Sequence, residues 1–169
     1  MRYYVANLFL ALLPPTRFFV FKRILLRTCG IGVGRGTRVC SRTKFYGAGR
    51  VVIGSDCWIG LETKFYTAEQ AQIRIGDRCD IAPEVMFICG SHEIGDAERR
   101  AGAGTACSIE IGSGIWIGAR STVLGGAQLS NSSIYAAGSL VLGGSYPESV
   151  LMAGHPVRVI RSLDVEGCG

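Results

Sequence analysis

The chain has 169 residues, enough for one domain with a sizeable core, and its 24 glycines are about twice the usual share of roughly 7 %. Its net charge is +5, and its basic residues are too scattered for a nucleic-acid stripe, so an anionic small ligand or a membrane surface is the expected partner. The seven cysteines form no CxxC pair and no zinc-ligand spacing, which indicates reduced thiols in a cytosolic protein: Cys29, Cys40, Cys57, Cys79, Cys89, Cys107 and Cys168.

Residues 1–30 predict a helical segment ahead of the main domain. The stretch from Tyr3 to Leu13 is apolar, but it is shorter than the roughly 20 residues that span a bilayer and lacks a signal-peptide cleavage site. Thr16 can cap a helix over 17–27, which Gly30 ends. This apolar and basic helix is expected either to cover the open end of the next domain or to attach to a membrane surface.

Residues 31–146 contain a six-residue repeat. Large apolar side chains recur every six positions in five groups of three, usually followed by a small residue. This period fits neither a helix nor a simple strand, but it fits a strand-and-corner unit of which three make one triangular coil. The chain is therefore predicted to be an all-β protein, a parallel β-helix, with these inward residues: Val33, Val39, Phe45, Ile53, Ile59, Phe65, Ile75, Ile81, Phe87, Ile111, Ile117, Val123, Leu129, Tyr135 and Val141.

Insertions in the repeat all fall at the same corner. Two residues follow the Phe45 hexad, four follow the Phe65 hexad and eighteen follow the Phe87 hexad. The longest insertion, residues 93–110, would place polar residues inside if it were a coil, so it is predicted to be a loop. Regular stacking is expected to end at Tyr146-Pro147, with residues 147–169 as a C-terminal tail.

The third face of the predicted prism has bulky residues on its outside. The residue after each inward position is large on this face and mostly small on the other two. An apolar row of this kind needs cover, so we expect a neighbouring subunit there, with the chain's own termini as the alternative. The row consists of Tyr46, Tyr66, Ile88, Leu124 and Leu142.

Four stretches of the sequence carry a resemblance to a known family: GSHEIGDAERRAG, IEIGSGIWIGARSTVLGG, YAAGSLV and AGHPVRVIR. They resemble the hexapeptide-repeat acetyltransferases, whose fold is a left-handed parallel β-helix, and most of all the small sugar O-acetyltransferases of galactoside, maltose and exopolysaccharide type. The N-terminal segment is similar to colanic-acid and capsule-type members. The resemblance implies a cytoplasmic homotrimer in polysaccharide biosynthesis, at the inner face of the membrane if the N-terminal segment attaches there.

The reaction that the resemblance implies is acetyl transfer from acetyl-CoA to a sugar hydroxyl in a ternary complex, without a metal. A hydroxyl that attacks a thioester must lose its proton, and histidine is the natural base near neutral pH. His92 matches the family's catalytic base, whereas His155 is expected to be structural. Glu93 and Asp96 are the nearby candidates to orient His92.

The acceptor site is expected to involve Glu62, Glu93, Arg99 and Arg100. Related sugar acetyltransferases have an acceptor-binding Asn where Glu62 stands, so this position is a departure from the family. Arg99 and Arg100 lie in the long insertion and could meet an anionic acceptor or CoA, or form a solvated loop.

For coenzyme A, the resemblance assigns Trp116, Ala119, Ala137, Arg158 and Arg161. The two alanines would let the pantetheine arm approach the backbone, and the arginines would lie near the nucleotide. Trp116 would either wall the site or pack as an ordinary aromatic side chain. Leu142-Gly143 replaces the family's usual Thr-Lys, so one phosphate contact is either missing or supplied elsewhere, with the basic N-terminal segment of a neighbour as a candidate.

The cysteines are not expected to take part in the reaction. Cys57 and Cys79 should lie one above the other as reduced thiols, and Cys89 is not expected to form an acyl-enzyme. The alternatives that stay open are an acetyltransferase for another small O- or N-acceptor and a non-enzymatic scaffold at the membrane surface. A zinc enzyme of this fold would need three histidines, which the chain cannot supply.

Overall fold

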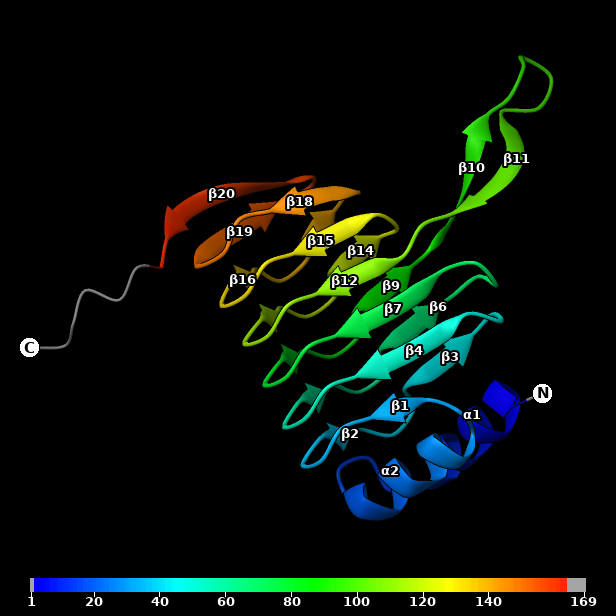
Figure 1. Ribbon diagram of the computed structural model, residues 1–169, viewed down its shortest axis with the longest axis vertical. Coiled ribbons are helices and arrows are strands. Elements are labelled where there is room, and N and C mark those ends of the chain that lie inside the picture. The colour runs from blue at the N-terminus through cyan, green and yellow to red at the C-terminus, as the bar shows by residue number, and fades with distance from the viewer. Residues whose placement is uncertain (1, 164–169) are drawn as a thin grey trace, which may run out of the picture.

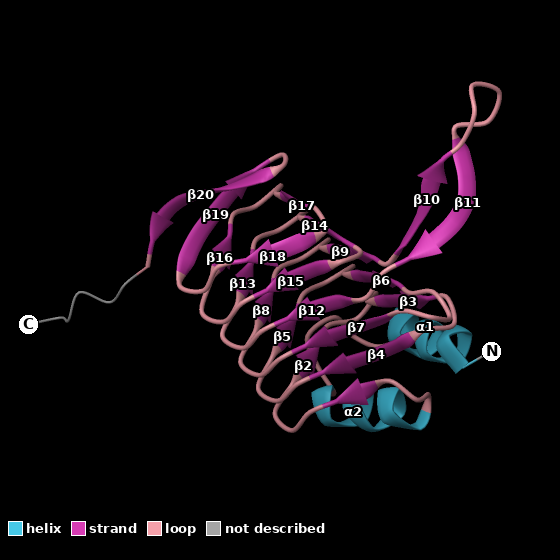
Figure 2. Ribbon diagram, turned by 45° about the horizontal axis from the view of Figure 1, so that its top comes forward, coloured by secondary structure: helices cyan, strands magenta, loops and turns pink. Residues whose placement is uncertain are grey.

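The computed structural model describes residues 2–163, so Cys168 and the last part of the predicted tail lie outside the described residues. The chain forms a three-sided parallel β-solenoid with two short helices at one end (Figures 1 and 2). The expected parallel β-helix of hexapeptide repeats is confirmed. In pairing order, its first sheet contains β1 (Gly32–Val33), β4 (Arg50–Ile53), β7 (Gln72–Ile75), β12 (Ile109–Ile111), β15 (Ala127–Leu129) and β18 (Gly144–Tyr146).

The other two faces repeat the same arrangement. The second sheet contains β2 (Arg38–Val39), β5 (Trp58–Ile59), β8 (Asp80–Ile81), β13 (Trp116–Ile117), β16 (Ile134–Tyr135), β19 (Val150–Gly154) and β20 (Val157–Ser162). The third contains β17 (Leu140–Val141), β14 (Thr122–Leu124), β9 (Met86–Ile88), β6 (Lys64–Tyr66) and β3 (Lys44–Tyr46).

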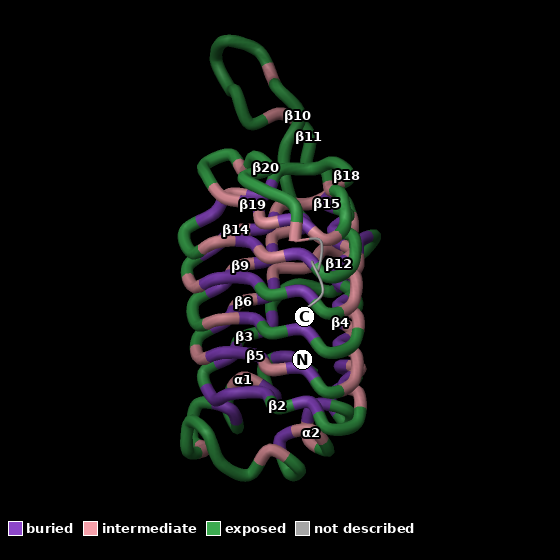
Figure 3. The backbone as a smooth tube through the Cα atoms, turned by 90° about the vertical axis from the view of Figure 1, so that its left-hand side faces the viewer, coloured by how far each residue is buried: buried purple, intermediate pink, exposed green. Residues whose placement is uncertain are grey.

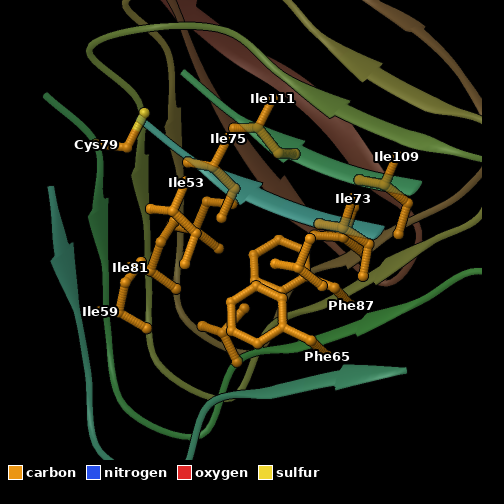
Figure 4. Close-up of a cluster of buried hydrophobic side chains, with 14 of the residues drawn as sticks. Ile53, Ile59, Phe65, Ile73, Ile75, Cys79, Ile81, Phe87, Ile109 and Ile111 are labelled. Atoms are coloured by element: carbon orange, nitrogen blue, oxygen red, sulfur yellow. The ribbon is translucent and has the colours of Figure 1, made fainter. Parts of the chain in front are cut away.

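The core is a set of stacked side-chain columns inside the prism. All fifteen predicted inward residues are buried, and each pairs in register with its equivalent in the next coil. On the third face, Phe65 stacks on Phe45 and Phe87 with ring centroids 4.9 and 5.1 Å apart. Figure 4 shows Phe65 and Phe87 facing the isoleucine columns of the other two sheets. Successive coils are thus held together by like-on-like packing as well as by the strand hydrogen bonds.

Parallel stacking continues beyond the point where the sequence places its end. Strands β18 and β19 pair in parallel with β15 and β16, which makes a sixth, partial coil. Tyr146 and Met152 take the positions above Leu129 and Tyr135. The chain then reverses, and β20 runs antiparallel to β19 and ends the second sheet.

Two helices, α1 (Arg2–Leu12) and α2 (Phe19–Thr28), cover the first coil (Figure 1). Thr16 does not cap α2: the residue before the helix is Phe18, in a left-handed conformation with φ 56° and without a side-chain cap. The buried ammonium of Lys22 donates to the carbonyls of Pro14 and Pro15, 2.8 and 3.0 Å away, and this contact ties the connecting segment to α2. The helix therefore begins later than the Thr16 cap predicts.

Candidate active site

The long insertion forms a β-hairpin that projects from the third corner. Strands β10 (Gly90–Ile94) and β11 (Ala101–Ala106) pair antiparallel, and the amide of Cys107 donates to the carbonyl of Cys89 at the base, 3.0 Å away. The sequence predicts a loop here, because a further coil would turn polar residues inward; in the structure, backbone pairing forms a hairpin. Most of its residues are exposed (Figure 3), so this arm gains little from packing on its own chain.

His92 lies on β10 near the base of this arm and is exposed. Its Nδ1 is 3.0 Å from the carbonyl oxygen of Gly102 on the opposite strand. Because a carbonyl only accepts, Nδ1 must carry the proton in this contact, and Nε2 of the neutral ring then has a free lone pair. The contact therefore fixes both the orientation and the tautomer that a general base needs.

Neither acidic neighbour orients His92. The carboxylate of Asp96 accepts from the amides of Glu98 and Arg99, 3.1 and 2.9 Å away, and so shapes the tip of the arm. Glu93 lies next to His92 on β10 and is exposed. The sequence did not indicate Gly102, since its role depends on the pairing of the two strands.

The two arginines of the insertion lie at the far end of the arm. Both are exposed, and the guanidinium of Arg100 donates to the carbonyl of Gly95, 3.4 Å away. Arg99 contributes its amide to the turn formed by Asp96, and the residue is exposed.

Glu62 lies elsewhere, at the second corner of the prism, where the chain turns from the second face to the third. Its carboxylate pairs with Arg42 of the preceding coil at 3.4 Å, and both side chains are about half exposed or more. Further along the same corner, Arg120 pairs with Glu84 at 3.0 Å. The first pair borders a pocket of about 320 Å³, and three of the five residues that line it are cationic: Ala11, Arg42, Lys44, Glu62 and Lys64.

The two alanines predicted for coenzyme A lie at this second corner, in the fourth and fifth coils. The coils approach so closely here that a Cβ on Gly118 would clash with the amide nitrogen of Ala137. The amide of Gly138 donates to the carbonyl of Ala119, 2.8 Å away. A long flexible ligand could therefore approach the backbone at Ala119 and Ala137, where the side chains are small.

Trp116 and the two C-terminal arginines share the second face. Trp116 is 53 % exposed, with its indole on the outside of β13. Arg158 and Arg161 lie on β20, opposite Ala153 and Leu151 of β19, and both are exposed. The predicted coenzyme A residues thus form one set along the second face and the second corner.

The predicted site residues consequently fall into two groups within one chain. Glu62 and the coenzyme A set lie at the second face and corner, whereas His92, Glu93, Arg99 and Arg100 lie on the arm at the third corner. The third face separates them, and its outer row is partly exposed: Tyr46 and Tyr66 stack with centroids 4.9 Å apart, and Leu142 is 40 % exposed.

Neither Cys79 nor Cys89 adds a nucleophile to either group. Cys57 and Cys79 lie one coil apart, and their thiols donate to the carbonyls of Gly76 and Gly112, each 3.1 Å away. The hydrogen bond with Cys57, followed by burial, raises the pKa of Cys79. Burial also raises the pKa of the Cys89 thiol to about 11, which disfavours the thiolate that an acyl-enzyme would require.

The described residues contain neither a metal-binding cluster nor a membrane-spanning helix. Within residues 2–163, no group of three His, Cys, Asp or Glu side chains is arranged to hold a metal ion. Neither of the two helices in this part of the chain has the length and apolar character to cross a membrane.

Comparison by sequence finds acetyltransferases, although no protein-family model matches the chain. A stretch of 117 residues is 35 % identical to a Saccharomyces cerevisiae protein provisionally named as an acetyltransferase, covering 65 % of this chain and 58 % of that protein. Galactoside O-acetyltransferase of Escherichia coli is 34 % identical over 92 residues, 54 % of this chain and 45 % of the enzyme. The chain thus spans about half the length of these relatives.

Comparison by structure finds the same solenoid in acyltransferases. A hexapeptide-repeat acetyltransferase from Vibrio cholerae, solved with acetyl coenzyme A, aligns with a TM-score of 0.78 at 23 % identity, over 96 % of this chain and 86 % of that one. A point mutant of AntD, a Bacillus cereus N-acyltransferase solved with coenzyme A and dTDP-4-amino-4,6-dideoxyglucose, aligns with a TM-score of 0.65 at 19 % identity, over 81 % and 86 %. At these identities the likeness establishes the fold.

Proposed function

We propose that the chain is a hexapeptide-repeat acetyltransferase that transfers an acetyl group from acetyl-CoA to a sugar hydroxyl, with His92 as the general base. The observation that carries this proposal is the contact of 3.0 Å between Nδ1 of His92 and the carbonyl of Gly102. It leaves Nε2 free to accept a proton on an exposed arm. The sequence relatives named as acetyltransferases and the acetyl-CoA complex of the same fold support the choice of reaction.

In the proposed reaction, Nε2 of His92 takes the proton of the acceptor hydroxyl as its oxygen attacks the thioester carbonyl. The bond from carbon to sulfur then breaks, and the imidazolium returns the proton to the leaving thiolate of coenzyme A. The carbonyl of Gly102 stabilises the imidazolium through its contact with Nδ1. A base of this kind typically contributes about 10²–10⁴-fold to the rate.

The complete site is proposed to form between two copies in a homotrimer. Within one chain, His92 and the coenzyme A set lie at different corners of the prism, so a second copy must bring them together. The partly exposed apolar row of the third face is suited to such an interface, because an uncovered row of this kind is costly in water. The arm would then place His92 against the second corner of the neighbour.

The acceptor is proposed to carry a negative charge, as a phosphate-linked sugar of polysaccharide biosynthesis does. The support is the pocket at Glu62, where Arg42, Lys44 and Lys64 outnumber the one carboxylate. Glu62 stands where related sugar enzymes have an Asn, and it would accept hydrogen bonds from sugar hydroxyls. Arg99 and Arg100 would meet the acceptor from the arm of a neighbouring copy.

The test is a thiol-release assay with acetyl-CoA and a panel of lipid-linked and nucleotide-linked sugars. His92→Ala should lower kcat by about 10²–10⁴-fold with an unchanged circular dichroism spectrum, because the base is lost and the ring is exposed. His155→Ala, at the other histidine of the chain, is the matched control and should retain full activity. Activity of His92→Ala within a factor of about three of the wild type would refute the proposal.

A second candidate is transfer to an amine, which the fold of AntD favours, since that N-acyltransferase was solved with an amino sugar nucleotide. The products distinguish O-acetylation from N-acetylation, because acetyl esters are cleaved by mild base and acetamides are not. A scaffold without enzymatic activity would bind no acetyl-CoA in calorimetry, and that result would exclude both reactions.

A further inference from the structure

The two N-terminal helices are apolar on the side that faces away from the solenoid. Across the described residues, fifteen large apolar side chains are exposed, and nine of them belong to this short segment: Tyr4, Val5, Leu8, Phe9, Leu12, Phe18, Val20, Phe21 and Ile24. Helix α1 already buries Tyr3, Ala6 and Leu10 against the core. A helix that packs on a core by one side and remains apolar on the other is not an ordinary surface helix.

This end of the molecule also holds most of the positive charge. The first 55 residues contain ten of the 18 lysines and arginines and none of the 13 acidic residues, the first of which is Asp56. The formal charge of this segment is therefore +10, and that of the other 114 residues is −5. The segment comprises the helices, the first coil and strand β4 of the second coil, which lie together at one end of the prism (Figure 1).

We propose that this N-terminal docking face, the outer side of α1 and α2 over residues 2–27, binds the surface of an anionic lipid bilayer. The exposed apolar side chains would enter the boundary between headgroups and acyl chains, and the arginines around them would meet lipid phosphates. The exposed side chains of Arg2 and Arg17 provide charge on this segment, whereas Arg27 donates to the carbonyl of Val33 in the first coil, 2.7 Å away. Since neither helix can span a bilayer, the face lies on the membrane.

Charge distinguishes a bilayer from a second copy as the occupant. Two such faces brought together would oppose segments of +10, whereas an anionic leaflet attracts the same charge. The lysine of α2, Lys22, is turned inward onto the carbonyls of the connecting segment, so the centre of the face stays apolar.

Docking would bring the candidate acceptor pocket to the membrane. Ala11 of α1 lines the pocket that holds Glu62, next to Lys44 and Lys64. An acceptor sugar carried on a lipid phosphate would then be presented at the pocket. This last step rests on the proposed function, whereas docking itself does not.

Flotation with vesicles tests the inference. The full chain should float with phosphatidylcholine vesicles that contain about 30 % phosphatidylglycerol and at least tenfold less with pure phosphatidylcholine. Leu8→Ser/Leu12→Ser should lower the partition coefficient more than tenfold, since both side chains are exposed and available to insert. Arg17→Glu should lower it roughly 25-fold, since each basic charge near an anionic surface contributes about fivefold.

Matched controls come from the rest of the prism. Ile94→Ser removes an exposed apolar side chain on the arm, and Arg78→Glu makes the same charge change at the first corner of the third coil. Both should bind like the wild type. Hydrogen exchange on the wild-type chain should slow in residues 2–28 on addition of the anionic vesicles, independently of any variant.

Three results would overturn the inference. The first is the absence of flotation with anionic vesicles. The second is equal loss of binding in Ile94→Ser or Arg78→Glu. The third is a shift of Leu8→Ser/Leu12→Ser to a smaller oligomer in sedimentation velocity, which would mean that a second copy covers the face. Acetyl transfer to a soluble acceptor should be unchanged in the double variant, so failure of docking and failure of the proposed reaction are distinguishable.

Discussion

Tyr135→Phe is expected to stabilise the protein, in contrast to most substitutions in a core. Tyr135 is fully buried on the second face, and its hydroxyl has no hydrogen-bond partner among the described residues. Burial raises the pKa of this phenol, as expected for a hydroxyl in an apolar setting. The ring packs edge-on against Tyr146, with centroids 6.2 Å apart at 82°, and phenylalanine would preserve that contact.

The gain can be estimated from the desolvation of an unpaired polar group. Leaving a buried hydroxyl unsatisfied costs about 1–3 kcal/mol, so its removal should raise the free energy of unfolding by about that amount. Each kcal/mol corresponds to roughly 2–4 °C in Tm for a chain of this size. Guanidinium denaturation and calorimetry of the wild type and the variant would measure both quantities.

Tyr146→Phe is the matched control for this prediction. Its hydroxyl donates to the carbonyl of Leu142, 2.9 Å away, so the same chemical change should cost about 0.5–1.5 kcal/mol. Opposite signs for the two variants would support the reasoning. If Tyr135→Phe were destabilised by about 1 kcal/mol or more, the hydroxyl would have to be satisfied, and the account of this column would be refuted.

Two further predictions concern the core and the base of the arm. Phe65→Ala should lower the free energy of unfolding by about 3–5 kcal/mol in guanidinium, since the ring is stacked on both sides, and a loss below about 1 kcal/mol would contradict the column packing. At pH 8 the exposed Cys107 should react with iodoacetamide long before Cys89, whose pKa of about 11 leaves roughly one thiol in a thousand ionised. Labelling of Cys89, followed by site-resolved mass spectrometry with Cys107→Ser as control, should rise about tenfold per pH unit up to about pH 11. A labelling rate that does not change with pH would show that the raised pKa of Cys89 is not what protects it.

The solenoid could be predicted from the sequence because its rule is local. Each hexad carries its own inward residue, and all fifteen predicted positions are buried, from Val33 to Val141. The rule weakens where the chain departs from the period. The partial sixth coil uses Tyr146 and Met152 after the regular spacing has ended, so the repeat alone did not locate it.

Features that depend on contacts between distant segments could not be predicted. The partner of His92 is Gly102, ten residues away, and a glycine has no side chain to suggest such a role. The Thr16 cap was wrong because a buried lysine, Lys22, ties down the preceding segment instead. In both cases the side chain is held by a backbone carbonyl. Because every residue has a backbone carbonyl, the sequence does not indicate which one will accept the hydrogen bond.

The charge distribution shows how the fold changes the meaning of a sequence pattern. Along the chain, the basic residues are too scattered to predict a nucleic-acid stripe. In a solenoid, however, each coil contacts only its neighbours, so the order of residues in the sequence becomes their order along the axis. A segment with ten basic and no acidic residues therefore becomes one positive end of a rod, with Asp56 marking where acidic residues begin. The same mapping places the exposed apolar helices at that end, and it is this coincidence that favours a membrane surface over a nucleic acid.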